Sequence, residues 1–248
     1  MTKISIAAAQ TIPVKGNVEE NVRKHEKLIK NAAEKEVDIL LFPELSLTGY
    51  ESDLAKDLAM NFFDERIQPL MHLSTIHNMV IVAGAPIRMD KSLYIGAFVF
   101  NPDSTISLYL KHYLHSGEDK VYQPGHLNPI ITVGSEKASI AICSDLTNPD
   151  HPADAAKNDS TLYLAGAFIS PEGYLNDSNL LIKYARKYGM GVALSNFGGE
   201  SGGMLSAGKS AIWSDSGEKV AGLDGLGEGL VIAKKINGKW SGKSMIIQ

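Results

Sequence analysis

The chain has 248 residues, of which 44% are hydrophobic and 21% charged, with a net charge of −4 and one cysteine. This is the composition of a globular protein with one large core, and the acidic balance argues against nucleic-acid binding. No stretch approaches the ~20 apolar residues of a membrane span, the N-terminal apolar run is too short for a signal peptide, and one cysteine allows no internal disulfide, so a soluble cytoplasmic protein is expected.

The chain opens with a predicted strand, helix and strand. Residues 3–9 are largely apolar and predict a strand. Residues 18–36 carry apolar side chains at helical spacing, and Asn17 stands where a helix cap is favoured. Residues 37–42 form a continuous apolar run that ends at Pro43 and Glu44. A strand, an amphipathic helix and a second strand are typical of a βαβ unit.

The middle of the chain alternates helical and extended patterns. Helical patterns fill most of residues 54–77, with a break near Asn61. The predicted strands and turns that follow are strands 79–86, 93–100 and 106–110, with turns at 88–92 and 101–104. Residues 112–129 are polar and irregular, and loops of this length in compact domains are often functional.

A strand pair is predicted next, over residues 130–133 and 138–142, and its second strand ends on Cys143. The apolar run before Cys143 shows no alternation, which favours a strand buried on both faces, although a short run also fits a turn of buried helix. A free cysteine usually packs as a small hydrophobic side chain. A thiol at the mouth of a buried strand is also where many enzymes place a nucleophile, so both interpretations stay open at this point.

The remaining elements follow in the same alternating manner. They are a short helix over 152–158, a strand over 161–165, a helix capped by Asn176 or Asp177 that runs to Tyr188 and is closed by Gly189, a strand over 192–195, a glycine-rich loop over 198–203, and strands with glycine turns over 210–236. The chain contains no internal repeat or linker. One α/β domain spanning residues 1–248 is therefore predicted.

Three reactive residues stand at or just past the ends of predicted buried strands: Glu44, Lys111 and Cys143. In α/β sheets the carboxyl ends of strands form the edge where ligands bind. Each residue alone has a simpler explanation, as a solvated turn, a surface charge or a packed thiol. Together they supply what the cleavage of an amide or nitrile C–N bond requires: a sulfur nucleophile, a carboxylate that moves protons, and a cation for the charge on oxygen.

Three segments resemble the motif blocks of the nitrilase, or carbon–nitrogen hydrolase, superfamily. They are Leu41-Phe-Pro-Glu44-Leu-Ser-Leu-Thr-Gly-Tyr50, Leu108-Tyr-Leu-Lys111-His-Tyr-Leu and Ala141-Ile-Cys143-Ser-Asp145. Their order and their spacing, 67 residues from Glu44 to Lys111 and 32 more to Cys143, fit the family. Each block alone is weak, and the ordered set is specific.

The resemblance implies a four-layer α-β-β-α sandwich of two mixed sheets that usually forms homodimers. It implies Glu44 as general base, Lys111 as stabiliser of the oxyanion, Cys143 as nucleophile and the backbone N–H of Ser144 as a second oxyanion donor. A thioester at Cys143 forms and is then hydrolysed, with no metal or cofactor. Glu118 matches a second glutamate that often joins this set, and it is expected to orient Lys111 or the substrate.

The substrate is less well defined by the sequence. Tyr50, Tyr122, Phe168 and Asn196 lie in loops near the predicted strand ends, so we expect them to approach the pocket. The run after Cys143 lacks an arginine that many family members carry. A small amide is favoured, and a nitrile is the alternative that the sequence does not separate from it.

The sequence also contains features of three other functions. Residues 203–210 match the phosphate-loop pattern of nucleotide hydrolases letter for letter, but a strand and a turn, not a helix, are predicted after Ser210. A metal site could use His112, His115, Glu118 and His151, but the loop lacks the regular structure that such sites use. A binding protein with a silent triad is the third rival, and the presence of all three triad residues argues against it.

Overall fold

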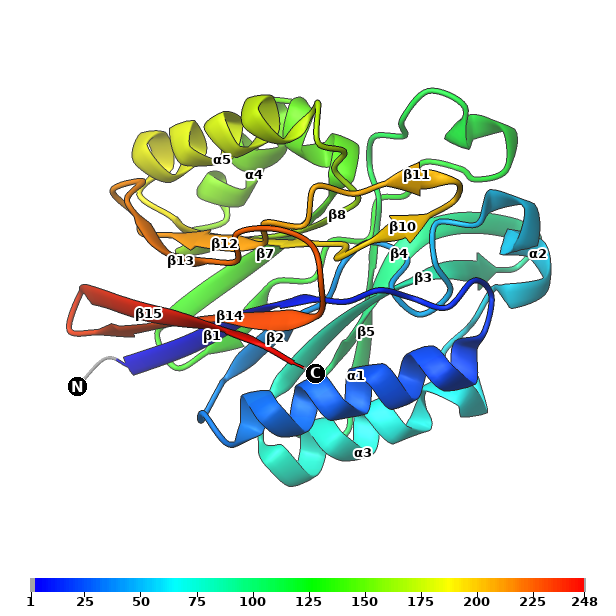
Figure 1. Ribbon diagram of the computed structural model, residues 1–248, viewed down its shortest axis with the longest axis horizontal. Coiled ribbons are helices and arrows are strands. Elements are labelled where there is room, and N and C mark those ends of the chain that lie inside the picture. The colour runs from blue at the N-terminus through cyan, green and yellow to red at the C-terminus, as the bar shows by residue number, and fades with distance from the viewer. Residues whose placement is uncertain (1–2, 248) are drawn as a thin grey trace.

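The protein has four layers, helix, sheet, sheet and helix, in a computed structural model that describes residues 3–247 (Figure 1). Helices α1 and α3 cover one sheet at the bottom of the view, and α4 and α5 cover the other at the top. The helices are α1 (Val18–Ala33), α2 (Ala55–Leu58), α3 (Gln68–His77), α4 (Asp150–Lys157) and α5 (Tyr174–Tyr188), with 3-10 turns η1 (Ser52–Leu54), η2 (Glu65–Ile67), η3 (Glu118–Lys120) and η4 (Cys143–Thr147). This is the sandwich that the sequence implied.

The larger sheet has seven strands within residues 3–247, in the order β15-β14-β1-β2-β3-β4-β5. Its strands are β1 (Lys3–Gln10), β2 (Ile39–Leu41), β3 (Val80–Met89), β4 (Ser92–Phe100), β5 (Ile106–Leu110), β14 (Gly229–Ile236) and β15 (Lys239–Ile246). Strands β1, β2 and β3 are parallel, and the other neighbours are antiparallel. Strand β4 runs opposite to β3, and β5 runs opposite to β4. Strand β5 therefore has the same direction as β3 and β2.

The smaller sheet has six strands among the described residues, in the order β13-β12-β9-β8-β7-β6. Its strands are β6 (Ile131–Val133), β7 (Glu136–Ile142), β8 (Leu162–Ala167), β9 (Gly191–Asn196), β12 (Ala211–Trp213) and β13 (Lys219–Gly222). Strands β7, β8 and β9 are parallel. A short hairpin of β10 (Glu200–Ser201) and β11 (Met204–Leu205) occupies the predicted glycine-rich loop.

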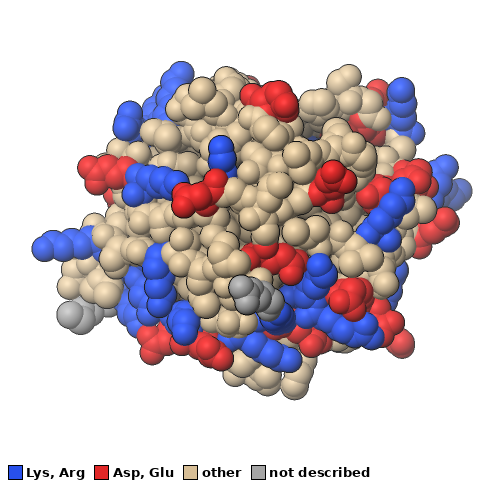
Figure 2. Space-filling view, in the orientation of Figure 1, with Lys and Arg blue, Asp and Glu red and all other residues tan. Residues whose placement is uncertain are grey.

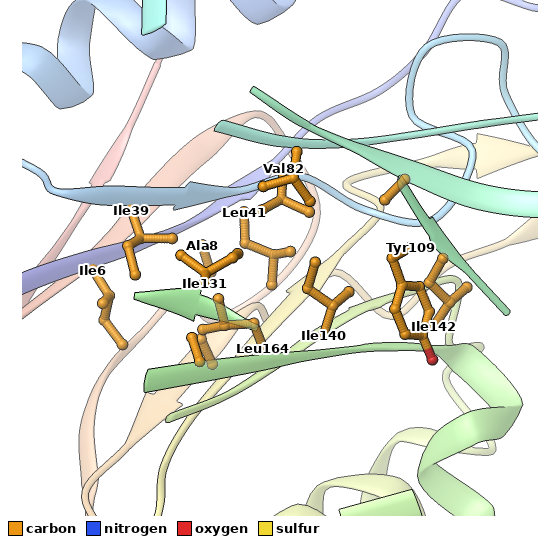
Figure 3. Close-up of a cluster of buried hydrophobic side chains, with 14 of the residues drawn as sticks. Ile6, Ala8, Ile39, Leu41, Val82, Tyr109, Ile131, Ile140, Ile142 and Leu164 are labelled. Atoms are coloured by element: carbon orange, nitrogen blue, oxygen red, sulfur yellow. The ribbon is translucent and has the colours of Figure 1, made fainter. Parts of the chain in front are cut away.

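The absence of alternation in the strand sequences has a direct cause, because both faces of the central strands are buried. In β1, Ile6 and Ala8 belong to the apolar cluster between the sheets, while Ala7 and Ala9 belong to the cluster under α1. Figure 3 shows the layer between the sheets, where Ile39 and Leu41 of one sheet face Ile131, Ile140 and Leu164 of the other. A third cluster joins the smaller sheet to α4 and α5.

Several predicted boundaries are confirmed with small shifts. The Asn17 side chain accepts a hydrogen bond from the Glu20 backbone and caps α1, which ends three residues earlier than expected because Glu36 adopts a left-handed conformation. The break near Asn61 is also present. There Met60 leaves the helical path to bridge Ile87 of β3.

Two expectations differ from the structure. Asn176 and Asp177 do not cap a helix, since α5 begins at Tyr174 and the Ser170 side chain accepts the Gly173 N–H just before it. The turn predicted over residues 88–92 is also shorter than expected, because β3 extends to Met89 and β4 already begins at Ser92.

Charged side chains of both signs are interspersed over the face drawn in Figure 2. This arrangement agrees with the small net charge and shows no basic surface on that face. Of the helices between residues 3 and 247, none combines the length and apolarity that a bilayer crossing requires.

Candidate active site

Glu44, Lys111 and Cys143 each follow a strand directly or within three residues. Glu44 follows β2, Lys111 follows β5 and Cys143 follows β7. Since β2 and β5 run in the same direction, Glu44 and Lys111 leave the larger sheet at one edge. Cys143 reaches this edge from the smaller sheet, so residues far apart in the chain meet between the two sheets.

Lys111 lies at the centre of a buried charge cluster. Its Nζ is 2.7 Å from Glu44 Oε1 and 2.8 Å from Glu118 Oε1. Glu118 Oε1 also accepts a hydrogen bond of 2.5 Å from the Tyr50 hydroxyl, and Glu118 Oε2 accepts one of 2.7 Å from the His115 backbone. The Lys111 side chain has no solvent-exposed surface. One cation therefore joins two carboxylates that are 74 residues apart in the chain.

Burial and neighbouring charges set the protonation of this cluster. Burial alone would lower the pKa of Lys111, but Glu44, Cys143 and Glu118 together raise that pKa above its usual range, so the ammonium stays charged. Burial raises the pKa of Glu44, and the charge of Lys111 offsets only part of this rise. A carboxyl group with a raised pKa is suited to accepting and returning a proton near neutral pH.

Glu44 has one oxygen that no other group uses. Its Oε1 binds Lys111, whereas Oε2 is buried and has no hydrogen-bond partner among residues 3–247. A buried acceptor without a partner is costly and uncommon in folded proteins. This oxygen is therefore available to take a proton from a group that enters the site.

Cys143 occupies a strained turn. Its φ angle of 46° lies in the left-handed region, which residues with a Cβ rarely adopt, and it joins β7 to the 3-10 turn η4. Such strain is concentrated at functional sites. The residue as a whole is only partly buried, and its Sγ lies 3.8 Å from the Phe168 carbonyl oxygen.

The thiol of Cys143 is held in its protonated form. Burial raises its pKa, Glu44 raises it further, and Lys111 offsets only part of the increase. Since only the thiolate is a good nucleophile, Cys143 needs a base when it reacts.

Two glycines allow the Glu44 segment to pass between the sheets. A Cβ on Gly84 of β3 would lie 2.4 Å from the Leu45 nitrogen, and a Cβ on Gly166 of β8 would lie 2.8 Å from the Phe42 oxygen. Both contacts are shorter than the packing of real side chains allows. Neither glycine was among the predicted site residues, although a glycine inside a buried strand is a known signal of close backbone approach.

Three of the four expected pocket residues lie near the cluster. Tyr50 binds Glu118, and its ring is 5.7 Å from that of Phe168. Tyr122 is buried, and the charges of Glu44 and Glu118 help burial raise its pKa. Phe168 supplies the carbonyl next to Cys143.

Asn196 differs from the expectation. Its side chain is fully buried, with Oδ1 accepting the Ile169 N–H and Nδ2 donating to the carbonyls of Ile169 and Gly208. All its polar groups are thus used by the backbone. Asn196 fixes the segment after Phe168 and offers no free group to a substrate.

The segment with the phosphate-loop pattern, residues 203–210, forms no phosphate site. Ser210 is followed by strand β12, so the segment does not open onto a helix N-terminus. Ser210 is buried and its Oγ accepts the Asn196 N–H, while the Lys209 ammonium extends over the Tyr174 ring at 5.4 Å.

Two of the three histidines considered as metal ligands have partners for their rings. His151 lies between the hydroxyls of Tyr109 and Tyr163, and His115 Nδ1 lies 3.3 Å from the Ser116 carbonyl oxygen. His112 Nε2 is buried and has no hydrogen-bond partner among the described residues. Between residues 3 and 247, no three His, Cys, Asp or Glu side chains are grouped as a metal ion would require.

Comparisons with known proteins indicate one family. The model of the family described as carbon-nitrogen hydrolase matches residues 5–236. The glutamine-dependent NAD(+) synthetase of Thermotoga maritima is 27% identical over 232 residues, which are 89% of this chain but only 40% of that protein. The nitrilase of Pyrococcus abyssi is 28% identical over 228 residues, covering 87% of this chain and 83% of that one.

The solved structures that match share the fold. An amidase of the nitrilase superfamily from Nesterenkonia AN1 has a TM-score of 0.85 and 22% identity, over 92% of this chain and 90% of that one. A structure of that amidase in complex with butyramide has a TM-score of 0.83 at the same identity, over 92% and 89%. In a further structure of it, the acetamide moiety of fluoroacetamide is covalently added to the active-site cysteine.

Proposed function

The chain belongs to the carbon–nitrogen hydrolase family, and we propose that it hydrolyses the C–N bond of a small amide through a cysteine thioester. The products are a carboxylic acid and ammonia or an amine. One observation carries the proposal: a charged, fully buried lysine binds a carboxylate that has a free oxygen, at the edge where a strained cysteine ends a strand.

In the first step Cys143 attacks the amide. Its Sγ forms a bond to the carbonyl carbon while its proton passes to Glu44 Oε2, the oxygen without a partner. The raised pKa of Cys143 requires such a base, and the raised pKa of Glu44 makes it a stronger one. The carbonyl π electrons move to oxygen, which becomes an oxyanion.

Lys111 and the turn after Cys143 hold this oxyanion. An ammonium has three N–H donors, and two of those on Lys111 bind Glu44 and Glu118, so one is left for the substrate. The backbone N–H of Ser144 is a second donor, because the first N–H groups of a helical turn lack partners within it. Donors fixed in advance stabilise the charge without having to reorganise.

The thioester forms and is then hydrolysed. The tetrahedral intermediate collapses, the C–N bond breaks, and Glu44 returns its proton to the departing nitrogen. Water then gives a proton to Glu44 and attacks the thioester carbon, the C–S bond breaks, and the sulfur recovers a proton as the acid leaves. Glu118 orients Lys111 in both steps.

The comparisons support a choice of substrates to test. Butyramide is bound by the structurally similar amidase, and glutamine is used by the NAD(+) synthetases, of which this chain spans less than half. A nitrile is the alternative, since a nitrilase is also among the relatives.

Ammonia release tests the proposal. Wild type and Cys143→Ala are incubated with butyramide, glutamine and a small nitrile. Release from an amide by wild type alone is the expected result. Release from the nitrile only would replace amide hydrolysis with nitrile hydrolysis.

Fluoroacetamide separates an enzyme from a silent binding protein. Cys143 is the only cysteine, so intact mass reports on a single thiol. From wild type we expect either a covalent adduct or ammonia release, and from Cys143→Ala neither; in the similar amidase the adduct is seen in a glutamate variant. A wild-type thiol that stays unmodified under conditions that label free cysteine in solution, together with no ammonia release, would contradict an enzymatic function.

A further inference from the structure

A further buried carboxylate, Asp145, lies outside the group that the proposed chemistry uses. The residue is fully buried. Its Oδ1 accepts the backbone N–H groups of His112 and Tyr113 at 3.1 and 2.9 Å. Its Oδ2 accepts the backbone N–H of Ile142 at 2.9 Å and the hydroxyl of Tyr109 at 2.6 Å. Four donors thus surround one carboxylate.

The positions of these donors in the chain are the informative feature. His112 and Tyr113 directly follow Lys111, and Ile142 directly precedes Cys143. Strand β5 is at the edge of one sheet and β7 is in the other, so no strand pairing fixes one relative to the other. Asp145 makes that connection between Lys111 and Cys143, and the Ser144 hydroxyl adds one bond by donating to the Tyr113 carbonyl oxygen.

Tyr109 strengthens the connection from within the core. Figure 3 shows its ring crossing the interior from β5, with the hydroxyl on the side of Ile142 in β7. Besides donating to Asp145, this hydroxyl lies 2.8 Å from His151 Nε2, and His151 Nδ1 lies 2.8 Å from the Tyr163 hydroxyl.

The direction of these hydrogen bonds follows from the donors available. The single proton of the Tyr109 hydroxyl goes to Asp145, so His151 Nε2 must donate to the Tyr109 oxygen. Burial lowers the pKa of His151, which leaves the ring neutral, and Nδ1 therefore accepts from Tyr163. Tyr163, His151 and Tyr109 thus form a chain in which each group donates toward Asp145. Hydrogen bonds aligned in this way strengthen one another.

We propose that Asp145 is a positioning residue for the amide hydrolysis, because its bonds to both strand ends set the separation of Lys111 Nζ and Cys143 Sγ. This inference rests on the proposed function. A carboxylate is required at this position since all four neighbours are donors. In an Asp145→Asn variant, the amide N–H₂ must face either Ile142 N–H or the N–H groups of His112 and Tyr113.

The experiment compares wild type, Asp145→Asn and a matched control, Asp38→Asn. Asp38 accepts the Ser5 N–H at 2.7 Å, before β2 and hence at the end of the sheet opposite Glu44. We expect kcat of Asp145→Asn to fall about 100-fold with KM nearly unchanged, the cost of misplacing a reacting group by about 1 Å. Asp38→Asn should keep the wild-type kcat.

A second readout requires no substrate. The rate at which iodoacetamide alkylates Cys143 is measured against pH in folded protein. Lys111 lowers the pKa of Cys143, so its displacement in Asp145→Asn should reduce the thiolate fraction and lower the alkylation rate at each pH measured. A purely stabilising role for Asp145 would lower the melting temperature and leave the profile in place.

The outcomes separate this inference from the proposed function. If wild type hydrolyses no amide, the alkylation profile still tests Asp145. If Asp145→Asn does not fold, Tyr109→Phe replaces it, which removes one of the four bonds and should lower kcat and the alkylation rate by smaller amounts. An unchanged alkylation profile in the folded variant, with kcat near wild type wherever wild type is active, would overturn the inference.

Discussion

The cluster around Lys111 and the segment of residues 203–210 are opposites. The segment carries a complete phosphate-binding pattern in its sequence but forms no phosphate-binding site. A strand follows it, and Ser210 is hydrogen-bonded to Asn196. Lys111, Glu44 and Cys143 lie in separate parts of the sequence and carry no strong motif individually. The fold brings Lys111 into a buried cluster with Glu44 and Glu118.

The difference lies in what surrounds the functional groups. A lysine on an exposed loop is screened by water and interacts weakly with its neighbours. A lysine without exposed surface, paired with two carboxylates, shifts the protonation of each neighbour. Reactivity therefore depends more on the environment of a side chain than on the sequence motif that contains it. Five predictions test that statement.

The largest effect is expected for Cys143→Ala, which should abolish turnover because it removes the proposed nucleophile. The residue is small and partly accessible, so the fold should survive the change. Ammonia release and circular dichroism check the two statements. Full activity in this variant would remove the thioester mechanism.

Lys111→Ala and Glu44→Gln should each lower the rate at least ~100-fold, through loss of the oxyanion donor or of the proton acceptor. Lys111→Ala also leaves Glu44 and Glu118 buried without their cation, so its melting temperature should fall more than that of Glu44→Gln. Steady-state kinetics and thermal melts measure both changes. A loss of only a few fold would make the residue peripheral.

Protonation of His25, which contacts residues on both sides of Glu44, should lower the free energy of unfolding of the protein. The ring is buried against Phe42, its Nε2 is 2.9 Å from Ser46 Oγ, and burial lowers its pKa to about 4. Between this pKa and the ordinary value near 6.5, the unfolded chain binds the proton that the folded chain excludes. The stability due to neutral His25 is therefore present above pH 6.5 and lost as pH falls, by about 2 kcal/mol between pH 7 and 5.

Denaturant melts at several pH values measure this dependence. His25→Gln, in which the titrating ring is absent, serves as the comparison and should show a shallower decline. Equal slopes for the two proteins would assign the acid sensitivity to other groups, such as His151, whose pKa is also lowered by burial.

Glu118→Gln should lower kcat about tenfold, because it weakens one charged hydrogen bond to Lys111. Tyr50→Phe is its matched partner, since it removes the hydroxyl that binds the same oxygen and keeps the charge. A smaller loss for Tyr50→Phe would assign the effect to the charge. Wild-type kinetics in Glu118→Gln would exclude an orienting role.

The smallest effect is expected for Lys209→Ala. The residue is exposed and its ammonium makes a cation–π interaction with the Tyr174 ring, so turnover should stay near wild type. Titration with ATP followed by calorimetry should detect no binding to either protein. Loss of both turnover and ATP binding in this variant would make residues 203–210 a functional site.

The sequence by itself determined the elements whose signals are local. The periodicity of residues 18–36 gave α1 apart from its end at Ala33, unbroken apolar runs gave the strands covered on both faces, and the positions of Glu44, Lys111 and Cys143 at strand ends followed from those runs. The family resemblance supplied the pairing of the two sheets into four layers.

Only the tertiary structure decided which polar groups remain free. Asn196 was expected to approach the pocket, yet its amide is used by Ile169 and Gly208, whereas Glu44 retains an oxygen without a partner. Asp145 stands two residues after Cys143 in the sequence, and its four donors became visible only in the fold. Periodicity reports which side chains are buried, but hydrogen-bond partners distant in the chain set their charge, orientation and reactivity.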